Sequence, residues 1–565
     1  MADSTAARLR GIESEVIGCY LAVRAFDAAV LGEPAWDRQP LPAISAAAQD
    51  DLAARIRHAR AELVAIDPAG LSPEDQLTLA MMTELTGYDV DALSARAPRY
   101  VVSPVPEAGL TAALLLFLPQ ASVGTDAALE TFVRAVREIP AALADSLAEL
   151  AAGRAAGQSP VAHLTERAAG QIDLYLATPP ERDPYVTAAR SAPCPAASRL
   201  ADELLRTVAG AVRPAFRRYR DALAADVLPQ ARDTSQPGLS WLPGGPDTYR
   251  AAVRAHTTLG IGPAEVHENG LELAAKIQRE AGQVARELGW DPDFAVIRDR
   301  LRADRDLHFR TADEMIAAAD TAMRRAIAAV PDWICDLPEA TCEVRRMDPL
   351  ETRNGVLGRY QSAPLDRHAP GAFWLNTASP ASRPVYETEA LAHHESVPGH
   401  HIEVSSSQEA GISSRFRRLA EVTPYREGWA LYMERFADQI GLYSGPLDRL
   451  GMLSFQLWRA GRLVVDTGMH EHGWSREQAI GYLWDNTILT RANIENEVDR
   501  YIACPGQALG YMTGQLAFQR LRAAAVADSG SAAQHREFHS RVLANGPLTL
   551  GCLSRSLGIE LAVFT

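Results

Sequence analysis

Apolar residues recur three and four positions apart through most of residues 1–230, in stretches dominated by Ala, Leu, Arg and Glu. This spacing puts the apolar side chains on one helix face, so it predicts amphipathic helices. Loops that contain proline, such as Glu33-Pro34, separate them. The pattern predicts helices near residues 5–30, 43–66, 73–97, 108–119, 125–153, 160–177 and 197–227.

A loop rich in Gly, Pro and Ser covers residues 233–246 and is the best internal boundary. We therefore expect an N-terminal helical lobe over residues 1–232 and a catalytic lobe over residues 233–565. Helices are expected near 247–256 and 263–288. A further helix follows Thr311, whose hydroxyl forms a capping box with Glu314.

The pattern changes between Cys342 and Thr377, where residues 343–345 and 371–376 are typical of short strands. This is the one β-rich region that the sequence predicts, and it leads directly into a histidine cluster. Helical spacing resumes after the cluster and continues to the end. The predicted fold is mainly α, with a small sheet beside the histidines.

Composition narrows the class of protein. The chain has 565 residues, 47% of them hydrophobic, and its formal charge of −15 is spread along the sequence. An acidic chain without basic clusters argues against nucleic acid as a partner. Residues 1–27 carry charges without an apolar signal core, and the apolar run at 109–118 is too short to span a bilayer. We expect a cytoplasmic protein that does not bind membranes.

The candidate chemistry lies in His393-His394-Glu395-Ser396-Val397-Pro398-Gly399-His400-His401. Histidine is a common zinc ligand, and a glutamate beside a ligand histidine commonly activates water. In the familiar H-E-x-x-H pattern two histidines four apart share a helix face. Here Pro398 stands at that position and His400 comes two residues later. Six residues of α-helix rotate about 240° and rise about 9 Å, so His394 and His400 cannot share a face in a regular helix.

Proline and glycine offer a solution to this spacing. Pro398 lacks the helical hydrogen-bond donor and Gly399 permits unusual dihedrals, so the helix is expected to open between Val397 and Gly399. His394 and His400 then converge on one metal. The pairs His393/His400 and His394/His401 share a face but lie about 10.5 Å apart along the axis. A surface histidine cluster without metal is the alternative.

A zinc enzyme needs a third protein ligand and leaves a fourth position for water. Thr423 and Pro424 are typical of a helix start, which puts Glu427 in the first turn of that helix. Taken alone, Glu427 is equally typical of a carboxylate stabilised by the helix dipole.

The combination of His394-Glu395-x-x-Pro398-Gly399-His400 with the segment beginning at Glu427 resembles a large bacterial family of proteins of unknown function. That family is regarded as zinc metallohydrolases related to the glutamate-type zincins. Similarity extends to residues 151–157, 242–245, 249–258, 462–470, 497–501 and 505–507. Related zincins, such as the Taq-type carboxypeptidases and angiotensin-converting enzymes, are mostly helical clefts with a small sheet at the metal, and we expect a two-lobed helical fold with a central cleft for this chain. The resemblance implies the same architecture here.

The resemblance also implies roles for individual residues. His394, His400 and Glu427 would bind one Zn²⁺ per chain, and Glu395 would act as the general base. The oxyanion needs a further donor, and Tyr511, Arg500 and Tyr501 are the candidates, with Tyr511 preferred. Arg500 is equally compatible with an ion pair to Glu497. Tyr501 is equally compatible with a core aromatic.

Two further groups are candidates for substrate binding. The strand with Gly371, Phe373 and Asn376 is suited to pairing with an extended substrate, or else forms plain core sheet. Asp466 and His470 are one turn apart and follow Arg462, a pattern that suits a substrate carboxylate or support of a metal ligand. An interhelical salt-bridge cluster is the alternative. The sequence assigns no role to His256, His393 or His401.

The expected function is zinc-dependent hydrolysis of an amide bond in short peptides or peptide-like molecules, by a carboxypeptidase- or dipeptidase-like enzyme in a monomer or a homodimer. Two alternatives stay open. One is a zinc amidohydrolase that acts on a non-peptide metabolite or biosynthetic intermediate. The other is a helical binding protein without catalysis.

Overall fold

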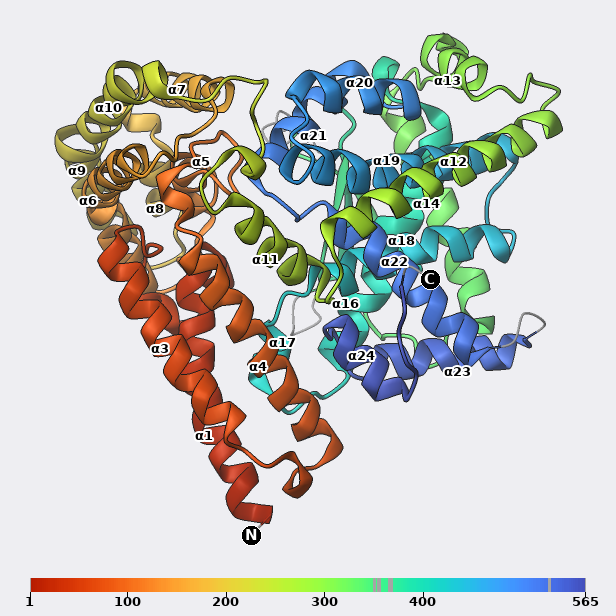
Figure 1. The fold of residues 1–565 in the computed structure, drawn as a ribbon, viewed down its shortest axis with the longest axis horizontal. Coiled ribbons are helices and arrows are strands. Elements are labelled where there is room, and N and C mark those ends of the chain that lie inside the picture. Colours follow the sequence, from red (N-terminus) through yellow and green to blue (C-terminus); the bar gives the residue numbers. More distant parts are fainter. Residues whose placement is uncertain (1, 349–351, 353–356, 364–368, 527–529, 564–565) are drawn as a thin grey trace. The chain divides into compact units, whose positions relative to one another are not determined.

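The computed structural model describes residues 2–348, 352, 357–363, 369–526 and 530–563. Two compact units make up the chain (Figure 1). Unit 1 comprises Met1–Ala252, Met469–Glu477 and Asp499–Pro505, and unit 2 comprises the rest. The boundary predicted from the loop at residues 233–246 assigns the two late segments to the second lobe, whereas in the structure they join the first compact unit.

The regular secondary structure among the described residues of unit 1 is helical, as its apolar spacing predicts, apart from an isolated bridge between Val161 and Arg232. Its helices are α1 (Ala2–Val23), α2 (Ala25–Leu31), α3 (Ala46–Val64), α4 (Pro73–Ser94), α5 (Leu110–Leu116), α6 (Asp126–Ala155), α7 (Ala162–Ala177), α8 (Pro184–Arg190), α9 (Ala197–Thr207), α10 (Arg213–Ala222) and most of α11 (Gly245–Thr257). The predicted helix at residues 197–227 is one continuous run in which π-helical turns at Val208–Val212 and Leu223–Val227 interrupt the α-helix.

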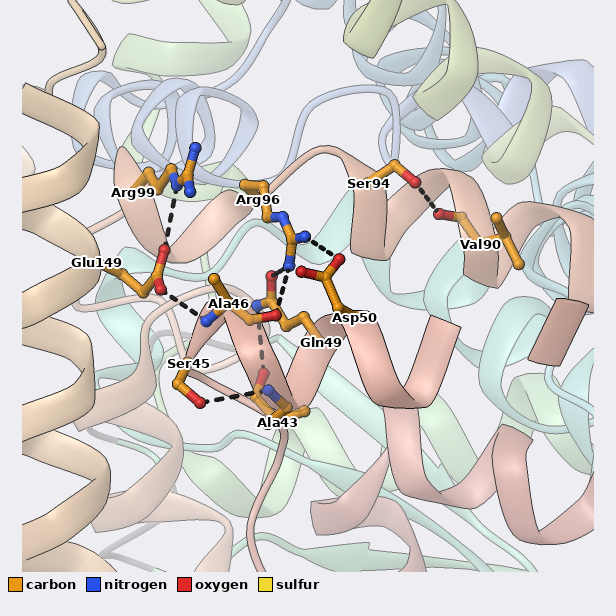
Figure 2. A network of polar contacts seen from close by, with 11 residues as sticks. Ala43, Ser45, Ala46, Gln49, Asp50, Val90, Ser94, Arg96, Arg99 and Glu149 are labelled. Atoms are coloured by element: carbon orange, nitrogen blue, oxygen red, sulfur yellow. Dashed lines mark hydrogen bonds and ion pairs between the residues drawn. The ribbon is translucent and has the colours of Figure 1, made fainter. Parts of the chain in front are cut away.

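A polar network fixes the start of α3 in unit 1 (Figure 2). Glu149 on α6 accepts a hydrogen bond from the Ala46 amide at 2.6 Å and pairs with Arg99 Nε at 3.1 Å. Arg96 donates to the Ala46 carbonyl at 3.1 Å and pairs with Asp50. The first amides of a helix lack intrahelical partners, so the Glu149 carboxylate satisfies one of them and complements the helix dipole.

Unit 2 contains the sheet and the remaining helices, except that the end of α19, the start of α20 and the end of α21 belong to unit 1. They are α12 (Pro263–Glu287), α13 (Phe294–Ala303), α14 (Ala312–Ala329), β1 (Cys342–Arg346), β2 (Gly358–Gln361), β3 (Gly371–Leu375), α15 (Thr388–Glu395), α16 (His400–Glu409), α17 (Arg415–Leu419), α18 (Thr423–Gln439), α19 (Pro446–His470), α20 (Arg476–Asn486), α21 (Arg491–Ala503), α22 (Leu509–Ala525), α23 (Ala532–Leu543) and α24 (Leu550–Leu557). The mainly α prediction is confirmed. The capping box of Thr311 and Glu314 is present at the start of α14.

The sheet has three strands in the order β1-β3-β2, with β3 parallel to β1 and antiparallel to β2. Phe373 and Leu375 of β3 pack in one apolar cluster with Ala319 of α14 and Ala392 of α15. The sheet therefore supports α15, the helix that carries His394. The strand β2 was not predicted from the sequence.

Helices α18 and α22 approach closely through glycine. A Cβ on Gly428 would lie 2.5 Å from Gly514 Cα, and a Cβ on Gly514 would lie 1.9 Å from the Pro424 carbonyl oxygen. Any side chain at either position would separate the two backbones. This contact joins the helix of Glu427 to the helix of Tyr511.

Candidate metal site

The helix that carries His394 ends at the predicted place. Helix α15 stops at Glu395 and α16 begins at His400. The backbone between them turns sharply, with φ −116° and ψ −115° at Ser396, and φ −76° and ψ −125° at Gly399. Trp429 of α18 donates its indole N–H to the Pro398 carbonyl at 3.1 Å and fixes the turn. The predicted departure from α-helix between Val397 and Gly399 is confirmed.

Gly399 is required by the closeness of this turn. A Cβ at position 399 would lie 2.0 Å from the His394 carbonyl oxygen and 2.4 Å from that of His393. Both atoms belong to the backbone and cannot rotate away. The chain can therefore fold back over the end of α15 only with glycine here.

The turn brings three predicted ligands together. His394 Nε2 lies 3.5 Å from Glu427 Oε2, and His400 Nε2 lies 3.7 Å from the same oxygen. The three ligand atoms all lie within 4.8 Å of one another. Zinc bonds of about 2.0–2.2 Å in tetrahedral geometry separate neighbouring ligand atoms by about 3.4 Å. The two separations from Glu427 match this value, whereas a pair as far apart as 4.8 Å must close by several tenths of an ångström to share one ion, because two such bonds span at most about 4.2 Å. The donor set, two nitrogens and one carboxylate oxygen, is that of a zinc site with a fourth position for water.

Charges within the cluster are strongly coupled. Burial lowers the pKa of His394, but hydrogen bonds to Glu427 and Glu434 outweigh it and raise the pKa to about 9. Burial raises the pKa of Glu427, but His394 and His400 outweigh it and hold that pKa well below its ordinary value. The cluster therefore stabilises a cation, which is a proton on His394 or a metal ion that displaces it.

Glu434 is a further residue of the candidate site, and it was not predicted from the sequence. Its Oε1 accepts a hydrogen bond from His394 Nδ1 at 2.8 Å, and its side chain is fully buried. Gln456 donates to the other oxygen at 3.4 Å. This bond fixes the His394 tautomer and directs Nε2 to the cluster, as carboxylates behind metal-bound histidines do. Glu434 follows Glu427 by seven residues, or two helical turns on one face, and this spacing is a signal that the sequence does contain.

Glu395 and Tyr511 lie in the same unit as the three ligands. Glu395 is the last residue of α15, adjacent to His394, and its exposed fraction is 9%. Tyr511 lies in the first turn of α22, and the Arg462 guanidinium sits 4.2 Å from the centre of its ring. Arg462 is paired with Glu497 at 2.9 Å. The preferred oxyanion donor is therefore a half-buried tyrosine beside a buried cation.

Arg500 and Tyr501 belong to unit 1, whereas the three ligands belong to unit 2. Tyr501 is 1% exposed, and the Arg500 guanidinium lies 5.9 Å from its ring centre. The sequence left Tyr501 open as an oxyanion donor or as a core aromatic. Its burial agrees with a core aromatic.

Strand β3 does not have the free edge that was expected of it. Both of its edges are paired, and Phe373 and Asn376 are 0% and 1% exposed. A Cβ on Gly371 would lie 2.5 Å from the Tyr360 hydroxyl. The prediction that this strand pairs with an extended substrate is wrong, because β1 and β2 occupy its backbone groups. The core-sheet alternative describes Gly371, Phe373 and Asn376.

Asp466 and His470 also bond to backbone. Asp466 accepts from the Gly506 amide at 3.0 and 3.2 Å. His470 accepts from the Leu239 amide at 3.0 Å through Nδ1 and donates to the Tyr501 carbonyl at 3.0 Å through Nε2. Burial lowers the His470 pKa to about 4. Both ring nitrogens of His470 are thus engaged by backbone groups.

The two outer histidines of the cluster point elsewhere. The His393 ring packs edge-on against Tyr443 at 5.2 Å, and Nδ1 lies 3.4 Å from the Val397 carbonyl. His401 donates through Nε2 to the Ala340 carbonyl at 3.0 Å, and its Nδ1 lies 3.0 Å from the Tyr360 hydroxyl. Both rings support the turn and the sheet.

Comparison with known proteins places the chain in a family. Residues 26–557 match the family described as "bacterial protein of unknown function (DUF885)", and the chain belongs to this family. No curated protein matches the sequence.

Two solved structures share the fold. One is described as a "putative lipoprotein" from Colwellia psychrerythraea, with TM-score 0.86 and 23% identity over 98% of both chains. The other is described as a "putative lipoprotein of unknown function" from Shewanella oneidensis, with TM-score 0.75 and 16% identity over 97% of this chain and 99% of that one.

These descriptions contradict the cytoplasmic location predicted from the sequence. That prediction rested on the lack of an apolar signal segment in residues 1–27, which does not determine location. Among the helices of the described residues, none combines the length and the apolar character needed to cross a bilayer.

Proposed function

We propose that this DUF885 member is a zinc-dependent hydrolase that cleaves an amide bond in short peptides or peptide-like molecules. The observation that carries the proposal is the convergence of His394, His400 and Glu427 at ligand distances beside Glu395. The relation to glutamate-type zincins, with a metal site served by a helical cleft, is part of the same proposal.

Each side chain of the site has a chemical task in this reaction. His394 Nε2, His400 Nε2 and a Glu427 oxygen would hold the ion, and Glu434 keeps the proton of His394 on Nδ1. Bound zinc supplies a Lewis acid that polarises the amide carbonyl and lowers the pKa of water to about 7.

The protons are moved by the chain itself. The Glu395 carboxylate takes a proton from the attacking water and delivers it to the leaving nitrogen. The Tyr511 hydroxyl donates a hydrogen bond to the oxygen on which negative charge develops. The Arg462 guanidinium lies over the Tyr511 ring, 4.2 Å from its centre, and this contact would hold the ring in position.

The test is a digest of a peptide library, read by mass spectrometry with and without a chelator. Purified protein should contain about one zinc per chain. Glu395→Gln should retain the zinc and lose about 10²- to 10⁴-fold in rate. Glu495→Gln removes an exposed carboxylate that pairs with Arg491, and it is the matched control that should cleave normally.

The outcomes separate the alternatives. Wild type without metal defeats the proposal. Full activity in Glu395→Gln shows that another group is the base. Zinc-loaded protein that cleaves no peptide favours a non-peptide amide as substrate.

A further inference from the structure

Arg459 on α19 is a buried arginine whose guanidinium is incompletely bonded. Its exposed fraction is 5%, and Nε and Nη1 find no hydrogen-bond partner among the described residues. Buried polar groups are nearly always bonded, and an unpaired buried cation is especially costly. A ligand that supplies an acceptor would complete the bonding of this guanidinium.

Aromatic rings hold this guanidinium in place. Its central carbon lies 4.2 Å from the Trp458 ring centre and 4.7 Å from the Phe455 ring centre. Such contacts cover the flat faces of the group and cost none of its donors, because the N–H bonds of arginine lie in the plane. The donors are therefore pre-oriented before any ligand arrives.

The position of Arg459 links it to the metal site. Gln456, Arg459 and Arg462 are spaced by three along α19, so each successive pair lies about 60° apart around the helix and Arg459 lies between the other two. Gln456 contacts Glu434 behind His394, and Arg462 lies over Tyr511. Arg459 thus lies between the residue that supports a metal ligand and the preferred oxyanion donor.

The charges that act on Arg459 agree with this placement. Burial lowers the pKa of its guanidinium, Glu434 raises it, Arg462 lowers it, and Tyr511 and Glu427 raise it. Glu387 also feels the charge of Arg459. The group therefore lies within electrostatic range of a metal ligand, on the side of the site formed by α18, α19 and α22.

A purely structural role as the counter-ion of Glu434 does not account for these contacts. The two oxygens of Glu434 already accept from His394 and Gln456. Glu427 Oε2 lies against both ligand histidines. Neither carboxylate bonds the free Nε or Nη1 of Arg459.

We propose that Arg459 binds a carboxylate of the substrate beside the scissile amide, namely the α-carboxylate of a peptide's C-terminal residue. A guanidinium fork matches a carboxylate in geometry. The nearby Glu427, Glu434 and Glu387 favour a singly charged anion over a doubly charged phosphate, because like charges repel. Resting on the proposed function, this inference makes the enzyme one that removes C-terminal residues or splits dipeptides.

The test compares N-acetyl-alanyl-alanine with its C-terminal amide, which differ only in the carboxylate. Binding is measured by calorimetry on two preparations that do not turn over the probe, chelator-treated wild type and the zinc-loaded Glu395→Gln variant. In both we expect the acid to bind at least about tenfold more tightly than the amide, the usual effect of a charge-assisted hydrogen bond.

Arg459→Met keeps the buried stem and removes the donors, so the acid should bind no better than the amide. Arg459→Lys keeps the charge without the fork, and it should retain only part of the preference. Arg435→Met is the control, because it removes a guanidinium of α18 that is already paired with Glu280 at 2.5 Å. Its preference for the acid should be unchanged.

The inference is overturned if the two preparations that retain Arg459 bind the acid and the amide equally, or do not bind the acid. This outcome does not require any Arg459 variant to fold. A preference that survives in Arg459→Met also overturns it. Chelator-treated protein separates this inference from the proposed function. An Arg459-dependent preference in a protein that never binds zinc would leave the inference standing and the hydrolase proposal defeated, whereas zinc and Glu395-dependent cleavage without the preference would do the reverse.

Discussion

The candidate metal cluster of unit 2 and the His470 environment of unit 1 present buried histidines in two opposite settings. His394 is 4% exposed at the end of α15, and His470 is 0% exposed at the end of α19. His394 bonds two carboxylates and its pKa rises to about 9, whereas His470 bonds an amide and a carbonyl and its pKa falls to about 4. Burial alone favours the neutral ring in both places. The partners decide whether a buried histidine holds a cation or serves as a structural link.

The largest expected effect comes from removing a ligand. His394→Ala should weaken zinc binding at least about a thousandfold, because one of three protein ligands is lost. His470→Gln, at a histidine just as buried, should bind zinc with unchanged stoichiometry. Calorimetric titration of the chelator-treated variants with zinc measures the affinity and the stoichiometry of each. An equal loss of zinc affinity in the two variants would show that His394 has no special role in binding the ion.

The second prediction concerns His470 and the pH dependence of the stability that it contributes. The His470 pKa is about 4 in the folded protein and about 6.5 when unfolded, so the unfolded state takes up a proton first as the pH falls. The contribution of His470 to stability is complete above about pH 6.5, and it should fall by about 3 kcal/mol as the pH drops to about 4.

Denaturant unfolding at a series of pH values measures this change as the difference between wild type and His470→Gln. The glutamine cannot protonate in this range, so the difference isolates the histidine from titrating carboxylates. A difference that stays constant between pH 7 and pH 4 would show that the ring is not held neutral.

The smallest expected effect tests how the carboxylate behind His394 tunes the cluster. Glu434→Gln keeps an acceptor near Nδ1 but removes the charge, and it should weaken zinc binding about 10- to 100-fold. Glu403→Gln is the control, since it neutralises a carboxylate of α16 that faces Arg426 at 3.5 Å. Zinc affinity measured by competition with a chelator of known affinity distinguishes them. Similar losses in both variants would attribute the effect to net charge alone.

Sequence reasoning succeeded where the cause was local. The capping box at Thr311, the helical spacing of unit 1 and the opening between Val397 and Gly399 each depend on residues within a few positions of one another. Glu427 was predicted as a third ligand only because a resemblance joined it to the histidines, and the structure places its carboxylate 3.5 Å from His394 and 3.7 Å from His400. Spacing alone left it a carboxylate at a helix start.

Sequence reasoning failed where the partner is distant along the chain. The central place of β3 depends on β2, whose four residues gave no strand signal strong enough to predict. His470 was a candidate for substrate binding because it is one turn from Asp466 and can share a helix face with Asp466 and Arg462. Its actual partners, the Leu239 amide and the Tyr501 carbonyl, are backbone groups that no side-chain pattern reports.

By itself, the sequence determined the helices, the break at Pro398-Gly399 and the donor atoms of the candidate ligands, because dihedral preferences and donor atoms belong to individual residues. Only the tertiary structure decided which buried groups meet. It set Glu434 behind His394, engaged both nitrogens of His470 with backbone, and left Arg459 with unpaired donors. The physical reason is that burial and pairing depend on packing between helices far apart in the chain, and that packing sets the charge each group can hold.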